Sequence, residues 1–169
     1  KIIKKSKKNE PLLEIAESQA LDRINRRNTF EWVKESFTHL REKLNLTNLE
    51  RIEAFDISHN QGSQVTASCV CFSKNGPDKK NYRSMNLTLE KNDDYLALSE
   101  AVRRRLKNLE DNKKSFPDLL IIDGGKGQLN SVSSELEKSG FKEINLISIS
   151  KGPLRNEKYD EIHLQNNPY

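Results

Sequence analysis

The sequence is short of cysteine and has no long apolar run, and each shortage removes a class of protein. No stretch of the 169 residues approaches the ~18 consecutive apolar residues of a membrane-spanning helix, and lysine-rich residues 1–8 precede no apolar signal core. We therefore expect a cytoplasmic protein without a membrane partner. Its two cysteines, Cys69 and Cys71, alternate along an expected strand without redox or zinc spacing, which predicts small buried side chains.

Several nucleotide-binding and hydrolase motifs are also missing. The glycine-rich run 124–127 has neither the Gly-Lys-Ser/Thr frame of a P-loop nor the spacing of a dinucleotide fingerprint. No Gly-x-Ser-x-Gly elbow surrounds Ser58, which stands beside His59, and this argues against a serine hydrolase. We expect no small-molecule cofactor, although the glycines could let the backbone approach a phosphate closely.

Charged residues, in contrast, are abundant. They make up 32% of the chain, and 29 Lys and Arg against 25 Asp and Glu give a formal net charge of +4. This balance suits a globular protein, and the length suits one main domain with an appendage. The basic excess is clustered at residues 1–8, 103–107 and 113–114, which could face nucleic-acid phosphates or be solvated helix faces.

The apolar pattern changes near residue 49. Residues 11–44 have helical spacing, so we expect residues 1–48 to form a basic segment and helical arm, and 49–169 to form the main domain. Helices are expected over 92–109 and 128–138, the first begun by a capping Asn92, with turns at 60–62 and 75–78. Strands are expected over 52–57, 64–73, 81–89, 119–122, 144–150 and 161–164. The order predicts an α/β fold, a mixed sheet of five to six strands flanked by helices.

Two of these strands deliver an aspartate at or near their end. Asp56 and Asp123 both stand among apolar residues, where a buried carboxylate is costly unless it is paired or bound to a cation. Two such acids indicate a shared Mg²⁺ or Mn²⁺ site that hydrolyses a phosphodiester. The alternative is that each aspartate caps a helix or closes a turn. His59 could lie near the site or be structural.

Two longer strings carry a resemblance. Residues 51–62 and 117–128 closely resemble the UvrC family of the bacterial excinuclease, and shorter matches extend the likeness over roughly residues 11–164. The resemblance implies an RNase H-like endonuclease that makes the 5′ incision in nucleotide excision repair. It also implies damaged double-stranded DNA as substrate and UvrB as partner, with UvrA acting upstream.

The resemblance also assigns roles to residues. Catalytic and metal-binding acids fall on Asp56 and Asp123, and a further catalytic acid falls on Asp93 or Asp94, of which we take Asp94. The family pattern and the basic clusters together give the side chains expected to contact DNA or its phosphates: Lys126, Gln128, Lys151, His59, Arg83 and Arg104.

Parts of the family pattern fall beyond residue 169. These are a catalytic histidine on a later helix, a tandem helix-hairpin-helix region and a segment that contacts UvrB. His163 is not expected to replace the histidine, because residues 161–164 indicate a strand. We therefore expect a domain whose C-terminal part is truncated and whose isolated activity is weak or absent.

Three other functions remain open at this point. One is a catalytically incomplete module that only binds nucleic acid. Another is a different RNase H-like repair nuclease resembling endonuclease V, although the Asp-Gly-Gly-Lys-Gly-Gln string at 123–128 argues against it. The third is a scaffold whose helical arm docks a protein, which good packing of Trp32 and Phe37 within the chain would exclude.

Overall fold

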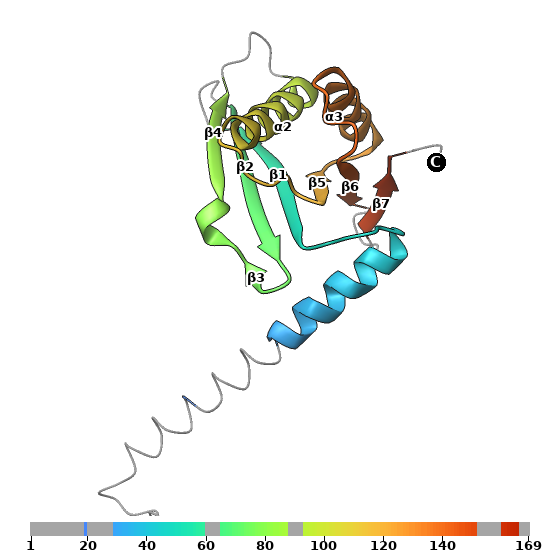
Figure 1. Cartoon of the computed structure of the whole chain (residues 1–169). Helices are drawn as coiled ribbons and strands as arrows, with labels where there is room; N and C mark the ends of the chain where they lie inside the picture. Colours follow the sequence, from blue (N-terminus) through green and yellow to red (C-terminus); the bar gives the residue numbers. More distant parts are fainter. Residues whose placement is uncertain (1–18, 20–28, 60–64, 88–92, 152–159, 166–169) are drawn as a thin grey trace, which may run out of the picture.

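The computed structural model describes residues 19, 29–59, 65–87, 93–151 and 160–165. This described part forms one seven-stranded sheet with helices on both faces (Figure 1). A helical segment covers 29–43. The elements that follow it are β1 (Arg51–His59), β2 (Val65–Ser73), β3 (Gly76–Pro77), the 3₁₀ turn η1 (Lys79–Asn81), β4 (Arg83–Leu87), α2 (Asp94–Asp111), β5 (Leu119–Asp123), α3 (Lys126–Lys138), β6 (Asn145–Lys151) and β7 (Asp160–Leu164).

The sheet is parallel in its centre and antiparallel at its sides. Its order is β3-β2-β1-β5-β6-β7, with β4 also paired to β2, and β5 runs parallel to both β1 and β6. This confirms the predicted α/β class and the central parallel strand. The strand beyond the expected six is β3, a two-residue pairing inside the predicted turn 75–78, where Gly76 takes a positive φ of 100°.

Helices α2 and α3 cover one face of the sheet, as Figure 1 shows. The core beneath them is apolar and fully enclosed, and Cys69 contributes to it with 1% of its surface exposed. Cys71 is also buried, so the prediction of two buried thiols is confirmed. Burial raises the pKa of both thiols, which keeps them protonated at neutral pH. The core-forming residues of the two helices include Leu98, Val102, Leu106, Leu129, Val132 and Leu136.

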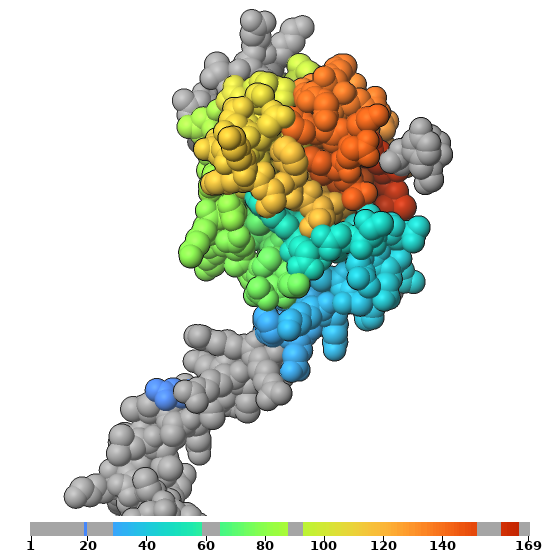
Figure 2. All heavy atoms as spheres, in the orientation of Figure 1, coloured from blue at the N-terminus to red at the C-terminus, as the bar shows by residue number. Residues whose placement is uncertain are grey.

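The helical segment 29–43 packs on the opposite face. Its Val33 and Phe37 contact a second apolar cluster that includes Ile52 of β1 and Leu119 of β5. In the space-filling view this segment lies directly against the sheet domain (Figure 2). A docking arm would be excluded if both Trp32 and Phe37 were packed within the chain. Phe37 is packed, but Trp32 is 66% exposed, so only one of the two meets that condition. None of the described helices has the length and apolar character needed to cross a membrane.

Two predicted boundaries differ from the structure. Helix α2 is capped by Asp93 rather than Asn92, because the Asp93 carboxylate accepts hydrogen bonds from the Tyr95 and Leu96 amides at 2.9 and 3.2 Å. Strand β4 begins at Arg83 because the chain first forms η1. The predicted turn at 60–62 lies outside the described residues, as do positions 88 and 89 of the strand expected to end there.

Candidate active site

Asp56 and Asp123 stand at equivalent positions on neighbouring strands. In the parallel register, Phe55 of β1 is level with Ile122 of β5, so the two aspartates follow side by side where the β1–β5 pairing ends, Asp123 as the last residue of β5 and Asp56 three residues before the end of β1. Side chains alternate along a strand, which places both carboxylates on the face that α2 and α3 do not cover. They border a hollow of about 370 Å³ lined by Ala54, Phe55, Asp56, Ser68, Val70, Ile121, Ile122, Asp123 and Ile149.

The expectation that these two carboxylates are buried is wrong. Both Asp56 and Asp123 are exposed at the rim of the hollow. The apolar residues next to them in sequence, Phe55 and Ile122, point to the helix-covered face and are 1% and 0% exposed. Water can therefore reach both carboxylates, and neither needs a cation to offset burial.

The alternative role as helix caps or turn closers does not fit this geometry. The N-cap of α3 is Gly125, whose amide donates to Gln128 Oε1 at 3.0 Å. Neither the Asp56 nor the Asp123 side chain makes a hydrogen bond or ion pair to another residue within the described part of the chain. Their oxygens are consequently open to solvent ligands.

The buried acid of β1 is Glu53, which the sequence reading did not single out. It is 0% exposed and is held by two hydrogen bonds from Arg105 of α2, Nε to Oε2 at 3.0 Å and Nη2 to Oε1 at 2.6 Å. Arg51 pairs with the same carboxylate, and Cys69 Sγ donates to it at 3.5 Å. The sequence signal that could have identified Glu53 is an acid at a position of the strand where alternation predicts an inward-facing side chain.

The basic cluster 103–107 is therefore not a uniform phosphate-facing surface. Arg105 is 2% exposed and is occupied by Glu53, which rules it out as a DNA contact. Arg103 and Arg104 both form ion pairs with Glu100 on the same helix, and Lys107 pairs with Glu110 and Asp111. Internal pairing along α2 explains most of this cluster.

The third predicted acid does not join the other two. Asp94 is exposed in the first turn of α2 and is absent from the lining of the hollow. Within the described residues, no group of three or more His, Cys, Asp and Glu side chains could hold a metal ion. The structure thus brings Asp56 and Asp123 together and leaves Asp94 apart from them.

Two predicted phosphate contacts lie at the edge of the sheet where the acids stand. Lys126 is the first residue of α3 and Lys151 is the last residue of β6, and both are exposed. Ile149 pairs with Asp123, so by alternation Lys151 extends on the same face as the carboxylates. Gln128 is used within the chain, because its side chain accepts the Gly125 amide.

Two of the three remaining predicted contacts, Arg83 and Arg104, are bonded to other parts of the molecule. Arg83 donates to the carbonyls of Lys80 and Tyr82. It stands opposite Cys69 in the β2–β4 register, so its side chain lies on the face that α2 and α3 cover. Arg104 pairs with Glu100 and donates to the Asn86 carbonyl. His59 ends β1, and its side chain lies outside the described structure.

His163 is engaged away from the aspartates. Its Nε2 lies 2.8 Å from Ser150 Oγ and 3.8 Å from a Glu161 oxygen. His163 pairs with Ser148 of β6, whose hydroxyl contacts the Gly125 carbonyl on the helix side. The paired aspartates occupy the other face, in line with the expectation that His163 does not serve them.

Comparison with known proteins agrees with this arrangement at the level of the domain. Residues 41–168 match the family model described as the UvrC RNase H endonuclease domain. UvrABC system protein C of Legionella pneumophila strain Paris is 46% identical over 120 residues, and that of Nitrosococcus oceani is 48% identical over 121 residues. Each alignment covers 70% of this chain but only 19% and 20% of the relatives, so the chain spans about a fifth of their length.

Solved structures give more distant likenesses. The catalytic domain of human endonuclease V is 19% identical with a TM-score of 0.47, covering 66% of this chain and 51% of that one. An Argonaute of A. aeolicus is 16% identical with a TM-score of 0.44, covering 70% of this chain and 17% of that one. Neither bears on what this chain acts on. The match over most of its length shows that the chain belongs to the UvrC RNase H endonuclease domain family.

Proposed function

We propose that this chain is a metal-dependent DNA endonuclease domain that makes the 5′ incision during bacterial nucleotide excision repair. The observation that carries the proposal is the placement of Asp56 and Asp123, which stand side by side and exposed where the parallel pairing of β1 with β5 ends. Membership of an endonuclease domain family supports the reaction class. A module that only binds nucleic acid would have no use for this pair.

The residues present suit a hard divalent cation. Mg²⁺ and Mn²⁺ take oxygen ligands, and Mg²⁺ sites in enzymes that act on phosphates often use one or two carboxylates plus water and substrate oxygens. Asp56 and Asp123 supply such a pair, with no competing partner in the described chain. When bound, the cation would activate water and stabilise the leaving oxygen of a phosphodiester. Asp94 remains a proposed additional acid.

The protein residues around this pair have separable roles. Asp56 and Asp123 would hold the cation and would so fix where the scissile phosphate binds. Lys126 and Lys151 attract the flanking phosphates, because both are exposed beside the carboxyl edge. The helical segment 29–43 packs on this face but contributes no residue to the lining of the hollow, so a DNA strand has access to the carboxylates that a closed metal cage would deny.

The larger context follows from the relatives and is part of the proposal. Their name, UvrABC system protein C, supports a place in the UvrABC system. The proposal is that the chain acts there on damaged double-stranded DNA together with UvrB, after UvrA has acted. Such a role belongs in the bacterial cytoplasm. The arm 1–48 would then join this nuclease domain, residues 49–169, to the rest of a longer protein.

Titration with metal tests the proposal directly. Calorimetry with Mg²⁺ and Mn²⁺, in the presence of a short DNA duplex, is compared between the wild-type chain and an Asp56→Asn, Asp123→Asn double variant. We expect metal binding to be lost in the double variant and kept in Asp111→Asn, a control whose acid lies at the far end of α2 and is 60% exposed. Strand cutting is assayed on the same samples. Metal binding that survives the double substitution would contradict the site.

A further inference from the structure

The alignment of the two aspartates depends on the register between β1 and β5. These strands are parallel neighbours, and the chain between them passes through β2, β3, β4 and α2, so no tight turn sets their register. A slip of one residue would send Asp56 and Asp123 to opposite faces. A slip of two would separate them by about 6.6 Å along the strands, since each residue rises about 3.3 Å.

One side chain joins the two strands at their other end. Asp118, the residue just before β5, accepts hydrogen bonds through Oδ2 from the amides of Glu50 and Arg51, each at 2.8 Å. Its Oδ1 accepts from Asn48 Nδ2 at 3.1 Å. The backbone amide of Asp118 donates to the Arg51 carbonyl at 2.9 Å. The first residue of β1 is thereby fixed, through both its amide and its carbonyl, to a single residue of the β5 chain.

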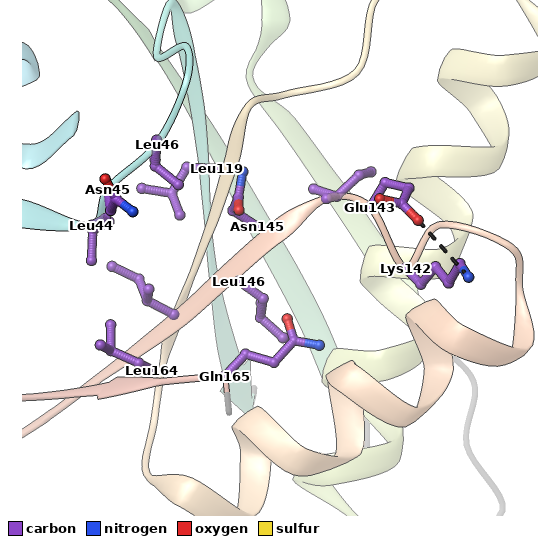
Figure 3. Close-up of a pocket in the computed structure, with 12 residues that line it drawn as sticks. Leu44, Asn45, Leu46, Leu119, Lys142, Glu143, Asn145, Leu146, Leu164 and Gln165 are labelled. Carbon is purple, nitrogen blue, oxygen red and sulfur yellow. Dashed lines mark ion pairs between the residues drawn. The ribbon is translucent and has the colours of Figure 1, made fainter. Parts of the chain in front are cut away.

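The same residue also reaches the third parallel strand. Asn145 Nδ2, at the start of β6, donates to the Asp118 carbonyl at 2.9 Å, and Asn145 is level with Leu119 in the β5–β6 register. Figure 3 shows Leu119 and Asn145 at this end of the sheet, beside a hollow distinct from the one at the aspartates. Arg51 adds a further bond, from Nη1 to the Ser115 carbonyl at 3.0 Å.

We propose that Asp118 is a positioning residue that sets the register of β1 against β5 and so holds Asp56 level with Asp123. It does this from the amino end of the β1–β5 pairing, whereas the two acids follow its other end. Asp118 directly precedes β5, so its short side chain could not keep its hydrogen bonds to the Glu50 and Arg51 amides if β1 shifted along β5. The inference rests on the proposed function in one respect, that the level pair is needed to hold metal.

The register can be read without nuclease activity. In a parent chain carrying Asp56→Cys and Asp123→Cys, the two introduced thiols stand where the carboxylates were, and soft thiolates bind a soft ion such as Cd²⁺. Cys69 and Cys71 stay silent because they are 1% and 0% exposed. Cd²⁺ affinity, followed by the thiolate-to-metal charge-transfer band, then reports whether positions 56 and 123 can share one ion.

Three variants of this parent decide the question. Adding Asp118→Ala should weaken Cd²⁺ binding about tenfold or more. Without Asp118 the register is no longer fixed, so the second thiolate is not held close to an ion that is bound to the first. Adding Asp118→Asn, which keeps an acceptor oxygen, should restore part of the affinity. Adding Asp111→Ala, an exposed acid that pairs with Lys107 on its own helix, should leave the affinity unchanged. Melting curves recorded alongside show that each chain is folded at the assay temperature.

Each outcome points to a different conclusion. Parental affinity in a folded Asp118→Ala chain would overturn the positioning role while leaving the metal site intact. Absence of Cd²⁺ binding by the parent would contradict the side-by-side placement on which both the positioning role and the proposed site rest. If the Asp118→Ala chain does not fold, the Asp118→Asn chain decides, and parental affinity there would overturn the role.

Discussion

Glu53 shows how one residue can couple the sheet to a helix through charge. Burial by itself raises the pKa of this carboxyl, but the hydrogen bonds and charges of Arg105 and Arg51 outweigh burial and hold the pKa below its ordinary value. A carboxyl with a lowered folded-state pKa contributes stability above its unfolded pKa of about 4.3, and that stability is lost as pH falls through the folded pKa. The chain should therefore lose stability below about pH 4.

Substitution of this acid is the corresponding prediction. Glu53→Gln should lower the free energy of unfolding by about 3–5 kcal/mol, because Arg105 is left as a buried charge without its partner. The variant should also lose the part of the acid-side slope that Glu53 supplies. Urea unfolding at several pH values measures both. Glu143→Gln is the control, since that side chain is 88% exposed, and an equal loss there would contradict the prediction.

Among the elements, the helical segment 29–43 gives a prediction about packing. Phe37 is 8% exposed against the sheet, whereas Trp32 on the same segment is 66% exposed. Phe37→Ala should lower the free energy of unfolding by about 3 kcal/mol, because it removes a buried ring and leaves a cavity. Trp32→Ala should change it by less than about 0.5 kcal/mol. Equal effects in thermal unfolding would mean that the segment does not pack this way in solution.

Sequence periodicity was sufficient for most elements, and its failures have physical causes. The four apolar residues 119–122 predict a strand buried on both faces, and β5 lies between two parallel neighbours. Strand β3 was not predicted, because a strand of two residues is too short to show an alternating pattern. The start of α2 was misplaced because Asn92 and Asp93 are both good capping residues, and only the hydrogen bonds distinguish them.

The candidate site was predictable in its residues but not in its surroundings. Strand ends and the resemblance both point to Asp56 and Asp123, yet the sequence does not say which sheet face α2 and α3 cover. That choice decides that both acids are exposed. The hydrogen bonds of Asp118 join residues that are far apart in the chain; Arg51, for example, is 67 positions away. No local sequence pattern predicts such a bond. Asp94 and the remaining site residues stay predictions.

At the scale of the whole molecule, the net charge of +4 overstates what is available to DNA. Arg105 is enclosed with Glu53, and Arg104 is paired with Glu100. The exposed Lys126 and Lys151 stand beside the carboxyl edge of the parallel strands, where the aspartates also lie. Position relative to the sheet therefore matters more for the DNA-facing surface than the count of basic residues.

This distribution predicts how DNA binding depends on salt. The logarithm of affinity should fall linearly with the logarithm of salt concentration, and Lys126→Ala or Lys151→Ala should each reduce the slope by about 0.9, one released counterion per lost phosphate contact. Arg83→Ala should leave the slope unchanged, because that guanidinium already donates to backbone carbonyls of its own chain. Fluorescence anisotropy with a labelled duplex at several salt concentrations measures the slopes. A smaller slope for Arg83→Ala than for either lysine variant would show that DNA crosses the helix-covered side of the sheet and misses the carboxyl edge.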